Sequence, residues 1–373
     1  MSENMSSEYA VIGGGVVGLS IAHGLLKLGK RVAVFDEGDD AFRASRGNFG
    51  LIWVQGKGLD QPAYARWSRR SATAWRDYAD ELTSASGLNL ALCQSGGYDY
   101  HMNEETLAST AVSYEALKGK LDGDYPFDIL DHGTLKKEEP GIGGRVAGAL
   151  LHHQDGHVNP LRLLQALASE VRRLGGVIRT RRYVENIKAA DGGYRLSLKH
   201  AEQVFTERVV LCAGLGVMDL GPDLGFIAPI RPQRGQVLIT EKLPPLMNRP
   251  ASTLRQVNEG GVQIGASKEE VGLDDRETLP VTAALAKHAV DVFPALSKAK
   301  LVRSWSALRI MSPDGLPIYQ QSRENPGVFL VTCHSGITLS AAHSRFLPLW
   351  LEGKTDAPDL TSFSEDRFSV QAA

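Results

Sequence analysis

The sequence has few cysteines, no excess of either charge and no long apolar run. Its three cysteines, Cys93, Cys212 and Cys333, lie far apart without CxxC spacing, which argues against a disulfide framework or a cysteine-rich zinc site. The formal charge of −2 lacks the strong basic excess that is typical of a nucleic-acid-binding protein. No apolar run approaches the roughly 20 residues that a transmembrane helix needs, and residues 1–8 do not resemble a signal peptide. These absences predict a cytoplasmic protein with no nucleic-acid partner and no transmembrane segment.

Histidines gather around Asp155, but they do not follow the spacing of a known metal site. His152, His153 and His157 match neither the helical nor the finger arrangement of zinc ligands. We therefore expect no bound metal.

Glycine is abundant, with 39 in 373 residues, and 43% of the chain is hydrophobic, enough for one large domain or two closely packed ones. Residues 9–36 predict a strand, a tight turn, a helix and a second strand. Short apolar runs flank a glycine turn and a segment with apolar residues at helical spacing. The second strand ends at Asp36, which completes a βαβ unit.

The glycine turn has the pattern of a dinucleotide-binding motif. Gly13 permits the tight turn, Gly15 lets backbone N–H groups reach a pyrophosphate, and Gly18 lets the helix press against the sheet. Asp36 is placed to accept hydrogen bonds from the adenosine ribose, and its carboxylate repels the 2′-phosphate of NADP. The alternative is a glycine turn in an α/β protein that binds no ligand.

The rest of the chain favours FAD over NAD. A classical NAD-binding domain continues with alternating strands and helices, whereas this chain continues with a polar glycine loop and tryptophan-bearing helices. Near the C-terminus, a strand at 328–332, a turn and a helix from 337 to about 351 repeat the pattern of the opening. The start of this helix would offer N–H groups to the pyrimidine carbonyl of a reduced flavin. Residues 336–339 are then flavin neighbours; the alternative is an ordinary glycine turn before a packing helix.

The predicted fold class is α/β with mixed α+β character: a Rossmann-like FAD-binding domain interleaved with a β-sheet-rich substrate-binding cap. A strong helical pattern opens at Asn159 and stops at Gly175, and a β meander covers about 194–216. Residues 84–145 look less regular, and residues 220–310 mix strands with turns. We expect the FAD-binding domain to comprise 1–80, 150–220 and 310–365, and the cap 81–149 and 221–309.

Six segments, in family order, carry a resemblance that covers essentially the whole chain. They are 11–20, 44–50, 155–160, 209–214, 230–236 and 308–317. The first two resemble the entry motif and the second flavin loop of the FAD-dependent D-amino-acid oxidase superfamily. The others are similar to its DGxxxP segment, AAG strand, PxRGQ element and RxxxPDGxP signature. Within the superfamily, the chain resembles the branch of glycine oxidase, sarcosine oxidase and opine or D-amino-acid dehydrogenases.

The resemblance implies oxidation of a CH–NH bond next to a carboxylate. The α-hydrogen passes as hydride to flavin N5, and water hydrolyses the imine to a keto acid or glyoxylate and an amine. Arg309 stands where the family places its carboxylate-binding arginine, and its planar fork suits that task; the alternative is a surface ion pair. The cysteine that binds flavin covalently in monomeric sarcosine oxidases has no counterpart near Ala307, so noncovalent FAD is expected.

The same resemblance implies a set of cofactor-binding residues from the glycine turn, the end of the second strand, the flavin loop, the meander and the C-terminal helix. They are Gly13, Gly15, Val16, Val17, Gly18, Asp36, Glu37, Ser45, Arg46, Asn48, Phe49, Gly50, Leu51, Val184, Ala213, Gly214, Gly336, Ile337, Thr338 and Leu339.

The cap departs from the glycine oxidase pattern. Glycine oxidase-like enzymes carry a substrate-contacting tyrosine before a proline–arginine pair, whereas residues 253–261 contain no tyrosine. This stretch and residues 47–58 look more like the flavin subunits of opine oxidase, cyanide-forming glycine dehydrogenase or heterotetrameric sarcosine oxidase. Arg255 is then a second candidate contact, suited to a dicarboxylate such as an opine; an ion pair within the cap is the alternative. His334 is a third candidate, in contact with substrate or ring; the alternative is a backbone hydrogen bond to the turn.

The expected partner is a small amino-acid substrate, in a homo-oligomer or a hetero-oligomeric dehydrogenase complex. Two other classes compete with this hypothesis. A reductase or hydroxylase supplied by NAD(P)H needs a second nucleotide site, and no second complete GxGxxG unit follows a strand. A flavin-bearing electron-transfer subunit would have its catalytic site in a partner chain. The electron acceptor, whether dioxygen, a quinone or a partner flavin, is left open.

Overall fold

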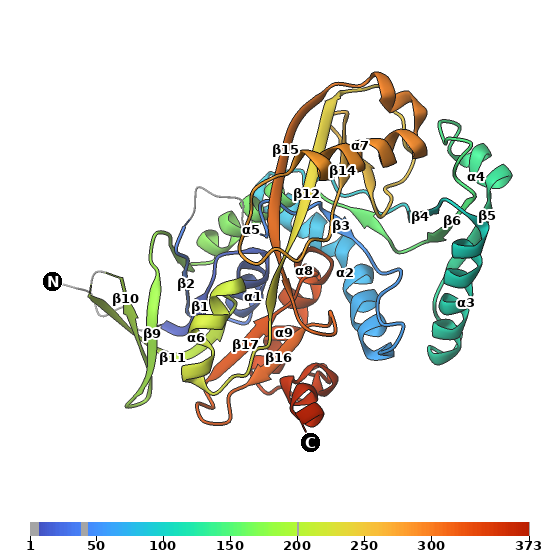
Figure 1. Cartoon of the computed structure of the whole chain (residues 1–373). Helices are drawn as coiled ribbons and strands as arrows, with labels where there is room; N and C mark the ends of the chain where they lie inside the picture. The colour runs from blue at the N-terminus through green and yellow to red at the C-terminus, as the bar shows by residue number, and fades with distance from the viewer. Residues whose placement is uncertain (1–6, 39–43, 200, 373) are drawn as a thin grey trace.

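The computed structural model describes residues 7–38, 44–199 and 201–372. A mainly parallel sheet with its helices forms one part of the molecule, and a cap built on antiparallel strands lies beside it (Figure 1). The chain passes between the two parts several times, so each part is assembled from segments that are distant in sequence. None of the helices in the described ranges is both long and apolar enough to cross a membrane.

The central sheet has the strand order β16-β17-β11-β1-β2-β8. Its strands are β1 (Ser7–Ile12), β2 (Val32–Phe35), β8 (Val177–Arg179), β11 (Glu202–Leu211), β17 (Val328–Thr332) and the antiparallel edge strand β16 (Ile318–Gln321). β1 and β11 are parallel, with Ile12 opposite Leu211. The turns that follow them, at Gly13 and Ala213, therefore lie at the same edge of the sheet.

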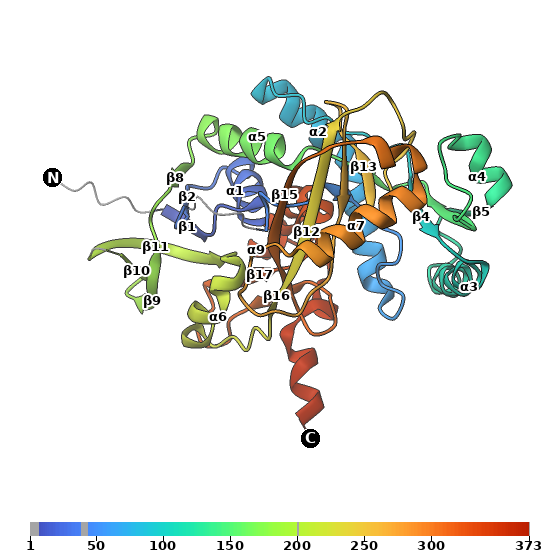
Figure 2. The same cartoon turned by 45° about the horizontal axis from the view of Figure 1, so that its top comes forward.

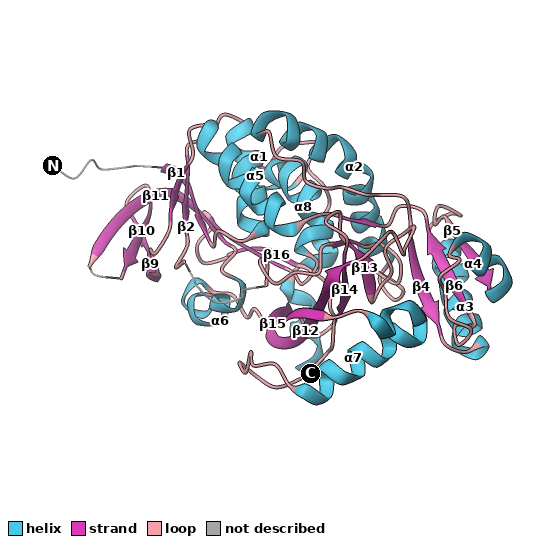
Figure 3. Ribbon diagram, turned by 90° about the horizontal axis from the view of Figure 1, so that it is seen from above, coloured by secondary structure: helices cyan, strands magenta, loops and turns pink. Residues whose placement is uncertain are grey.

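Helices cover one face of this sheet (Figure 3). They are α1 (Val16–Lys27), α2 (Pro62–Ser86), α5 (Pro160–Arg173) and α8 (Gly336–Arg345). α1 and α8 pack closely because Gly24 has no side chain; a Cβ there would overlap the carbonyl oxygen of Ser344. The hairpin of β9 (Val184–Ala190) and β10 (Gly193–Leu198), together with α6 (Val217–Leu220), packs on the other face.

These elements confirm the predicted fold class, the opening βαβ unit, the helix after Asn159 and the meander. The single helix expected from 337 to about 351 is wrong. The chain forms α8 and then α9 (Leu347–Leu351), because Pro348 has no N–H to donate and its ring is incompatible with a continuous helix.

Residues 84–145 are more regular than expected. They contain α3 (Glu104–Lys120), α4 (His132–Glu138) and the strands β4 (Gly97–His101) and β5 (Phe127–Asp131). Both strands pair with β6 (Gly148–His152), so the three form a sheet with the order β4-β6-β5. In Figures 1 and 3 this small sheet and its two helices lie at the opposite end of the molecule from β9 and β10.

The cap is centred on a four-stranded antiparallel sheet with the order β13-β14-β12-β15. Its strands are β12 (Arg231–Lys242), β13 (Leu254–Gln256), β14 (Gly261–Gly265) and β15 (Leu301–Met311). One face packs on α7 (Leu279–Val292), a helix that the sequence analysis missed, and Figure 2 shows it lying against this sheet. Leu238, Ile264 and Val292 belong to the core that α7 and the cap sheet share with the small three-stranded sheet.

The opposite face of the cap sheet, called the polar face below, carries the two candidate arginines, Arg255 and Arg309. The strand register places Arg255 opposite Gln263, and Trp305 and Arg309 fall on the same face by the alternation of side chains along β15. The Trp305 indole Nε1 donates to the carbonyl oxygen of Gly47 at 3.0 Å. This bond joins the polar face directly to the predicted flavin loop.

Candidate functional site

The glycine turn after β1 requires glycine at two of its three positions. Gly13 has a φ of +109°, and its N–H donates to the carbonyl oxygen of Phe35 at 2.8 Å. A Cβ at Gly13 would overlap the carbonyl oxygen of Cys212, and one at Gly18 would overlap that of Gly13. The turn therefore brings β1, β2, β11 and the start of α1 together, with the positive end of the α1 dipole at its centre.

Asp36 lies directly after β2, where the sequence places the ribose contact. Its Oδ2 accepts from the N–H of Gly14 at 2.6 Å, and its Oδ1 accepts from the N–H of Gly38 at 2.8 Å. The carbonyl oxygen of Asp36 accepts from the N–H of Arg182 at 2.9 Å, two residues before Val184 at the start of β9. Asp36 thus joins the glycine turn to the segment before β9; Glu37 follows Asp36 directly in the chain, and Val184 begins β9.

The predicted flavin loop touches the first turn of α1. The Ser45 hydroxyl accepts from the N–H of Val16 at 3.0 Å and lies 2.9 Å from the point that a Cβ of Gly15 would occupy. The Asn48 Oδ1 accepts from the N–H of Gly50 at 2.7 Å, which fixes the turn before β3 (Leu51–Ile52). The loop that contains Arg46 and Phe49 is thus held between α1 and the cap.

The first turn of α8 meets the first turn of α1. A Cβ at Gly336 would lie 2.8 Å from the Val16 Cγ1 and 3.2 Å from the Val17 Cγ2. The Thr338 Oγ1 accepts from the N–H of Trp53 at 3.1 Å. Ile337 and Leu339 are buried beside it. Two helix N-termini that are 320 residues apart in sequence therefore lie together, and the expectation that residues 336–339 neighbour a flavin stays a prediction.

Ala213 and Gly214 connect this region to the cap. They follow β11 directly, and Gly214 has a φ of +59°. A Cβ at Gly214 would lie 3.8 Å from the Ile310 side chain, the neighbour of Arg309 on β15. The β11 turn thus stands between the glycine turn and the cap sheet.

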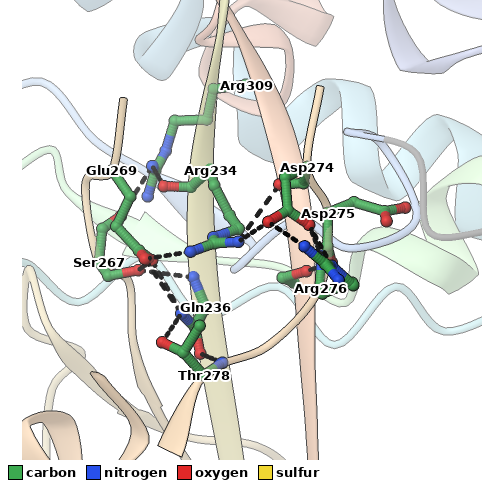
Figure 4. Close-up of polar contacts among 10 residues, drawn as sticks. Arg234, Gln236, Ser267, Glu269, Asp274, Asp275, Arg276, Thr278 and Arg309 are labelled. Atoms are coloured by element: carbon green, nitrogen blue, oxygen red, sulfur yellow. Dashed lines mark hydrogen bonds and ion pairs between the residues drawn. The ribbon is translucent and has the colours of Figure 1, made fainter. Parts of the chain in front are cut away.

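Arg309 has an enclosed guanidinium that is not paired with a carboxylate within the described ranges. Its Nη1 donates to the carbonyl oxygens of Ser267 at 2.8 Å and Arg234 at 3.3 Å (Figure 4). Gly235 makes room for it, since a Cβ there would lie 2.6 Å from the Arg309 Nη2. Burial lowers the pKa of Arg309. Within the described ranges Arg309 forms no ion pair, and its role in binding a substrate carboxylate stays a prediction.

The carboxylate that acts electrostatically on Arg309, that of Glu269, is hydrogen-bonded to other groups. The Glu269 Oε2 accepts from the Arg234 Nη2 at 2.6 Å, and its Oε1 accepts from the Gln236 Nε2 at 2.9 Å (Figure 4). Arg234 also pairs with Asp274 at 3.3 Å. These bonds hold the segment after β14 against β12. Ser267 belongs to this segment, so the network fixes one of the two carbonyl groups that orient Arg309.

Arg255 lies on the same face of the cap sheet, in a different environment. Its Nε donates to the Gln263 Oε1 at 2.6 Å, and its Nη1 donates to the carbonyl oxygen of Val158 at 3.0 Å. The same Nη1 is 3.0 Å from the His157 Nδ1. Burial lowers the pKa of Arg255 to about 9. Its hydrogen-bond partners among the described residues are neutral groups, although the negative charge of Glu259 also acts on it. Its role as a substrate contact stays a prediction.

His334 is a neutral imidazole held in the turn before α8. Its Nε2 lies 3.0 Å from the Ser335 Oγ. Burial lowers its pKa to about 3, and the positive charges of Lys57, Arg309 and Lys268 act in the same direction. This contact is to a side chain of the turn and not to its backbone, so it decides neither of the two expectations for His334. The positive charges around His334 make this end of the site favourable for anions.

Lys57 was not selected from the sequence, although it belongs to the glycine-rich stretch 47–58. Its Nζ donates to the Ser335 Oγ at 2.6 Å and lies 3.4 Å from the Tyr64 OH. The spacing of glycines in this stretch predicts turns, but nothing in it indicates that a lysine is enclosed. Asp155 of the DGxxxP segment binds the same stretch, because its Oδ1 accepts from the N–H of Val54 at 2.5 Å.

The histidines near Asp155 are separated by the fold. His152 is buried, with its Nδ1 3.8 Å from the Asp155 Oδ1, whereas the exposed His153 pairs with Asp128. In the ranges that the structure covers, no three histidine, cysteine or acidic side chains are grouped so that they could hold a metal ion.

The arrangement fits an extended dinucleotide flavin. N–H groups at α1 suit the pyrophosphate, Asp36 suits the ribose, and a second helix N-terminus lies between them and an arginine without a carboxylate partner. The group that fits these donors carries a diphosphate at one end and a ring that gains negative charge at the other.

Comparisons with known proteins agree with this geometry. Residues 8–347 match the model of a family described as FAD dependent oxidoreductase. An opine oxidase subunit from Agrobacterium tumefaciens is 39% identical over 98% of this chain and 99% of its own. The HcnC subunit of hydrogen cyanide synthase from Pseudomonas aeruginosa is 26% identical over 99% of this chain and 98% of its own. The crystal structure of glycine oxidase from Geobacillus kaustophilus superposes with a TM-score of 0.89 at 26% identity, covering 96% of this chain and 98% of that one.

Proposed function

The chain belongs to the FAD-dependent oxidoreductase family, and on that premise we propose that it oxidises the CH–NH bond of a small N-substituted amino acid of the opine class. An opine here means an amino acid whose nitrogen carries a second carboxyl-bearing carbon. Glycine, sarcosine and D-amino acids are the smaller members of the same substrate series. The substrate class is supported by the 39% identity to a protein named as part of an opine oxidase.

The observation that carries the proposal is the state of Arg309. Its guanidinium is enclosed, held by two carbonyl oxygens and free of a carboxylate partner within the described residues. Lys268 adds a second positive charge near His334. A substrate with two carboxylates suits such a site better than one with a single carboxylate, because Arg309 can bind one carboxylate while the positive charge of the exposed Lys268 favours the second.

Arg309 would orient the substrate in this reaction. The bound FAD supplies a two-electron acceptor at its N5 atom. Arg309 fixes the substrate carboxylate so that the α-carbon faces the ring, which replaces a bimolecular encounter with a positioned one. The CH–NH bond becomes C=N as hydride leaves the carbon and a proton leaves the nitrogen. Water then hydrolyses the imine to a keto acid and an amine.

We further propose that the FAD is noncovalent and that the twenty residues named from the resemblance hold it. Ala307 lies on the polar face of the cap sheet, two residues from Arg309, and offers no thiol for a covalent link. In this proposal residues 1–80, 150–220 and 310–365 form the FAD-binding part. Residues 81–149 and 221–309 form the cap.

A hetero-oligomer is the second part of the proposal. Two relatives that match this chain over nearly its full length are named as subunits, one of opine oxidase and one of hydrogen cyanide synthase. We propose that the chain passes its electrons to a partner protein rather than directly to dioxygen. Co-expression with candidate partner chains, followed by size-exclusion chromatography, tests this part on its own.

The experiment that tests the activity is anaerobic mixing of the yellow protein with a panel of amines. The panel contains glycine, sarcosine, D-alanine, D-proline and an opine. We expect the opine to bleach the flavin fastest, and an air pulse then reports whether dioxygen accepts the electrons. A protein that carries FAD and is bleached by none of these compounds would contradict the proposed activity.

A further inference from the structure

Lys57 places an enclosed amine beside the positive end of α8, and the proposed hydride transfer does not yet use it. Its Nζ donates to the Ser335 Oγ at 2.6 Å and lies 5.4 Å from the centroid of the Tyr64 ring. Ser335 immediately precedes Gly336, the first residue of α8. The ammonium group therefore adds a full charge to the partial positive charge of the helix N-terminus.

The charge of Lys57 is not neutralised by any described residue within ion-pair distance. Asp155 is the acid that acts on it, and that carboxyl already accepts from the Val54 N–H at 2.5 Å and from the Gln55 Nε2 at 2.8 Å. Burial raises the pKa of Asp155 to about 8, whereas burial lowers the pKa of Lys57 to about 8. Burial thus disfavours the charged form of both groups, and no described carboxylate pairs with the Lys57 ammonium. An enclosed cation without an anion is costly unless a ligand supplies one.

Lys57 borders the chain of contacts that joins the glycine turn to the neighbourhood of Arg309. Trp53 lies four residues earlier, and its backbone N–H donates to the Thr338 Oγ1 in the first turn of α8. That turn abuts Val16 at the glycine turn, and His334 on the other side is under the influence of Arg309. A cofactor whose diphosphate lies at α1 and whose ring lies beside Arg309 must pass this point.

We propose that Lys57 contacts the cofactor and, with the first turn of α8, stabilises the negative charge that the flavin pyrimidine ring acquires on reduction. The inference rests on the proposed function, because it needs bound FAD. In this account Lys57 acts on the cofactor, whereas Arg309 anchors the substrate. The enclosed cation then has its anion in the reduced state of the enzyme.

A structural role is the competing explanation. Lys57 would then pin the glycine stretch 47–58 to Ser335, and its charge would not matter. The two roles differ in what they predict for ligands of the oxidised flavin. Sulfite forms a bond from its sulfur to flavin N5, and the negative charge then resides on the N1–C2=O side of the ring. Its affinity reports a nearby cation without any turnover.

The test is a sulfite titration of three purified holoproteins: the wild type, Lys57→Met and Lys57→Arg. Binding is measured as the bleaching of the visible flavin band. We expect Lys57→Met to weaken sulfite binding by about tenfold or more, and Lys57→Arg to restore most of the affinity. The reduction potential of the bound flavin should fall in Lys57→Met. Lys27→Met removes an exposed lysine at the far end of α1 and should match the wild type.

Three results separate the failures. Wild-type protein that carries no flavin would contradict the proposed function itself. Wild-type and Lys57→Met proteins that both carry FAD and bind sulfite within twofold of one another would overturn the Lys57 assignment alone. Should Lys57→Met lose its flavin on purification, Lys57→Gln is compared with Lys57→Arg, and equal sulfite affinities in those two variants would overturn the assignment in the same way.

Discussion

The glycine turn and the cap sheet present their polar groups in opposite ways. At the turn, the polar groups are backbone N–H groups. Gly13 and Gly18 carry no Cβ, which lets the strands and the helix approach one another closely. On the cap sheet, the groups are long side chains, Arg309 and Arg255, that reach inward from the strands. The first kind of site depends on backbone shape, whereas the second depends on which neighbours leave a side chain unpaired.

Replacing Gly18 attacks the backbone-built site, and we expect the largest effect from it. A Cβ at Gly18 would overlap the carbonyl oxygen of Gly13, so Gly18→Ala should displace the turn or the helix by more than FAD binding tolerates. The variant should be purified without colour. Gly119→Ala is the control, because a Cβ at this α3 position meets nothing within 4 Å. A yellow Gly18→Ala protein with wild-type FAD content would contradict this view of the turn.

Replacing Arg309 attacks the side-chain-built site and should spare the cofactor. Arg309→Ala should keep its FAD but lose roughly 100-fold in the second-order rate of flavin reduction by substrate, since a charged hydrogen bond contributes about 1.5–3 kcal/mol. Arg309→Lys should recover only part of this rate, because an ammonium lacks the planar fork. Arg231→Ala, an exposed residue of β12 paired with Glu270, is the control. An unchanged rate in Arg309→Ala would remove the carboxylate anchor.

The bond between Trp305 and Gly47 joins the two regions, and its loss should have an intermediate effect. Trp305→Phe removes the indole N–H and leaves the carbonyl oxygen of Gly47 without this donor. The dissociation constant for FAD should rise by roughly tenfold, which corresponds to about 1.4 kcal/mol. The measurement is an FAD titration of the apoprotein. Trp350→Phe, which shortens a ring that packs on Phe329 in the other part of the molecule, should leave the constant unchanged.

Glu139 extends the comparison to stability and should have the smallest effect. Glu139 follows α4 directly, and its buried carboxyl accepts from the backbone N–H groups of Asn248 and Arg249 at 3.0 and 3.2 Å. Desolvation raises its pKa to about 7, above the ordinary value of 4.5. The pKa of Glu139 is higher in the folded state than in the unfolded state, so protonation of this carboxyl stabilises the fold. This contribution to the free energy of unfolding is fully present below about pH 4.5 and is lost as the pH rises through 7.

The corresponding measurement is the melting temperature of the wild type and Glu139→Gln from pH 5 to pH 8. The wild type should lose a few degrees more than the variant across this interval. Glu115→Gln, an exposed residue of α3, should follow the wild type. Parallel curves for the wild type and Glu139→Gln would show that the carboxyl does not gain its proton on folding.

The comparison also explains what can be predicted from the sequence. The glycine turn, Asp36 and the first turn of α8 were predictable because glycine spacing between a strand and a helix is a local pattern. The environment of Arg309 was not, because its carbonyl partners are at Ser267 and Arg234, and the acid near it is occupied by other groups. Whether an arginine is enclosed and unpaired depends on segments that only the fold brings together.

The missed helices have a similar explanation. α3 buries Leu107, Ala111, Tyr114 and Leu117, which is a helical pattern, but Val112 on its exposed side weakens the contrast between its two faces. α7 begins with an exposed Leu279 and buries little beyond Ala289 and Val292. Where apolar residues lie on both faces of a helix, periodicity alone does not separate it from an irregular segment.

A crystal structure of the holoprotein with an unreactive carboxylate, such as acetate, tests the account most directly. We predict a flavin whose diphosphate lies at the first turn of α1 and whose ring lies between the first turn of α8 and Arg309. The carboxylate should lie within about 3 Å of the Arg309 guanidinium, on the face of the ring that the cap sheet covers. A ring that points away from α8, or a carboxylate bound without Arg309, would contradict the account.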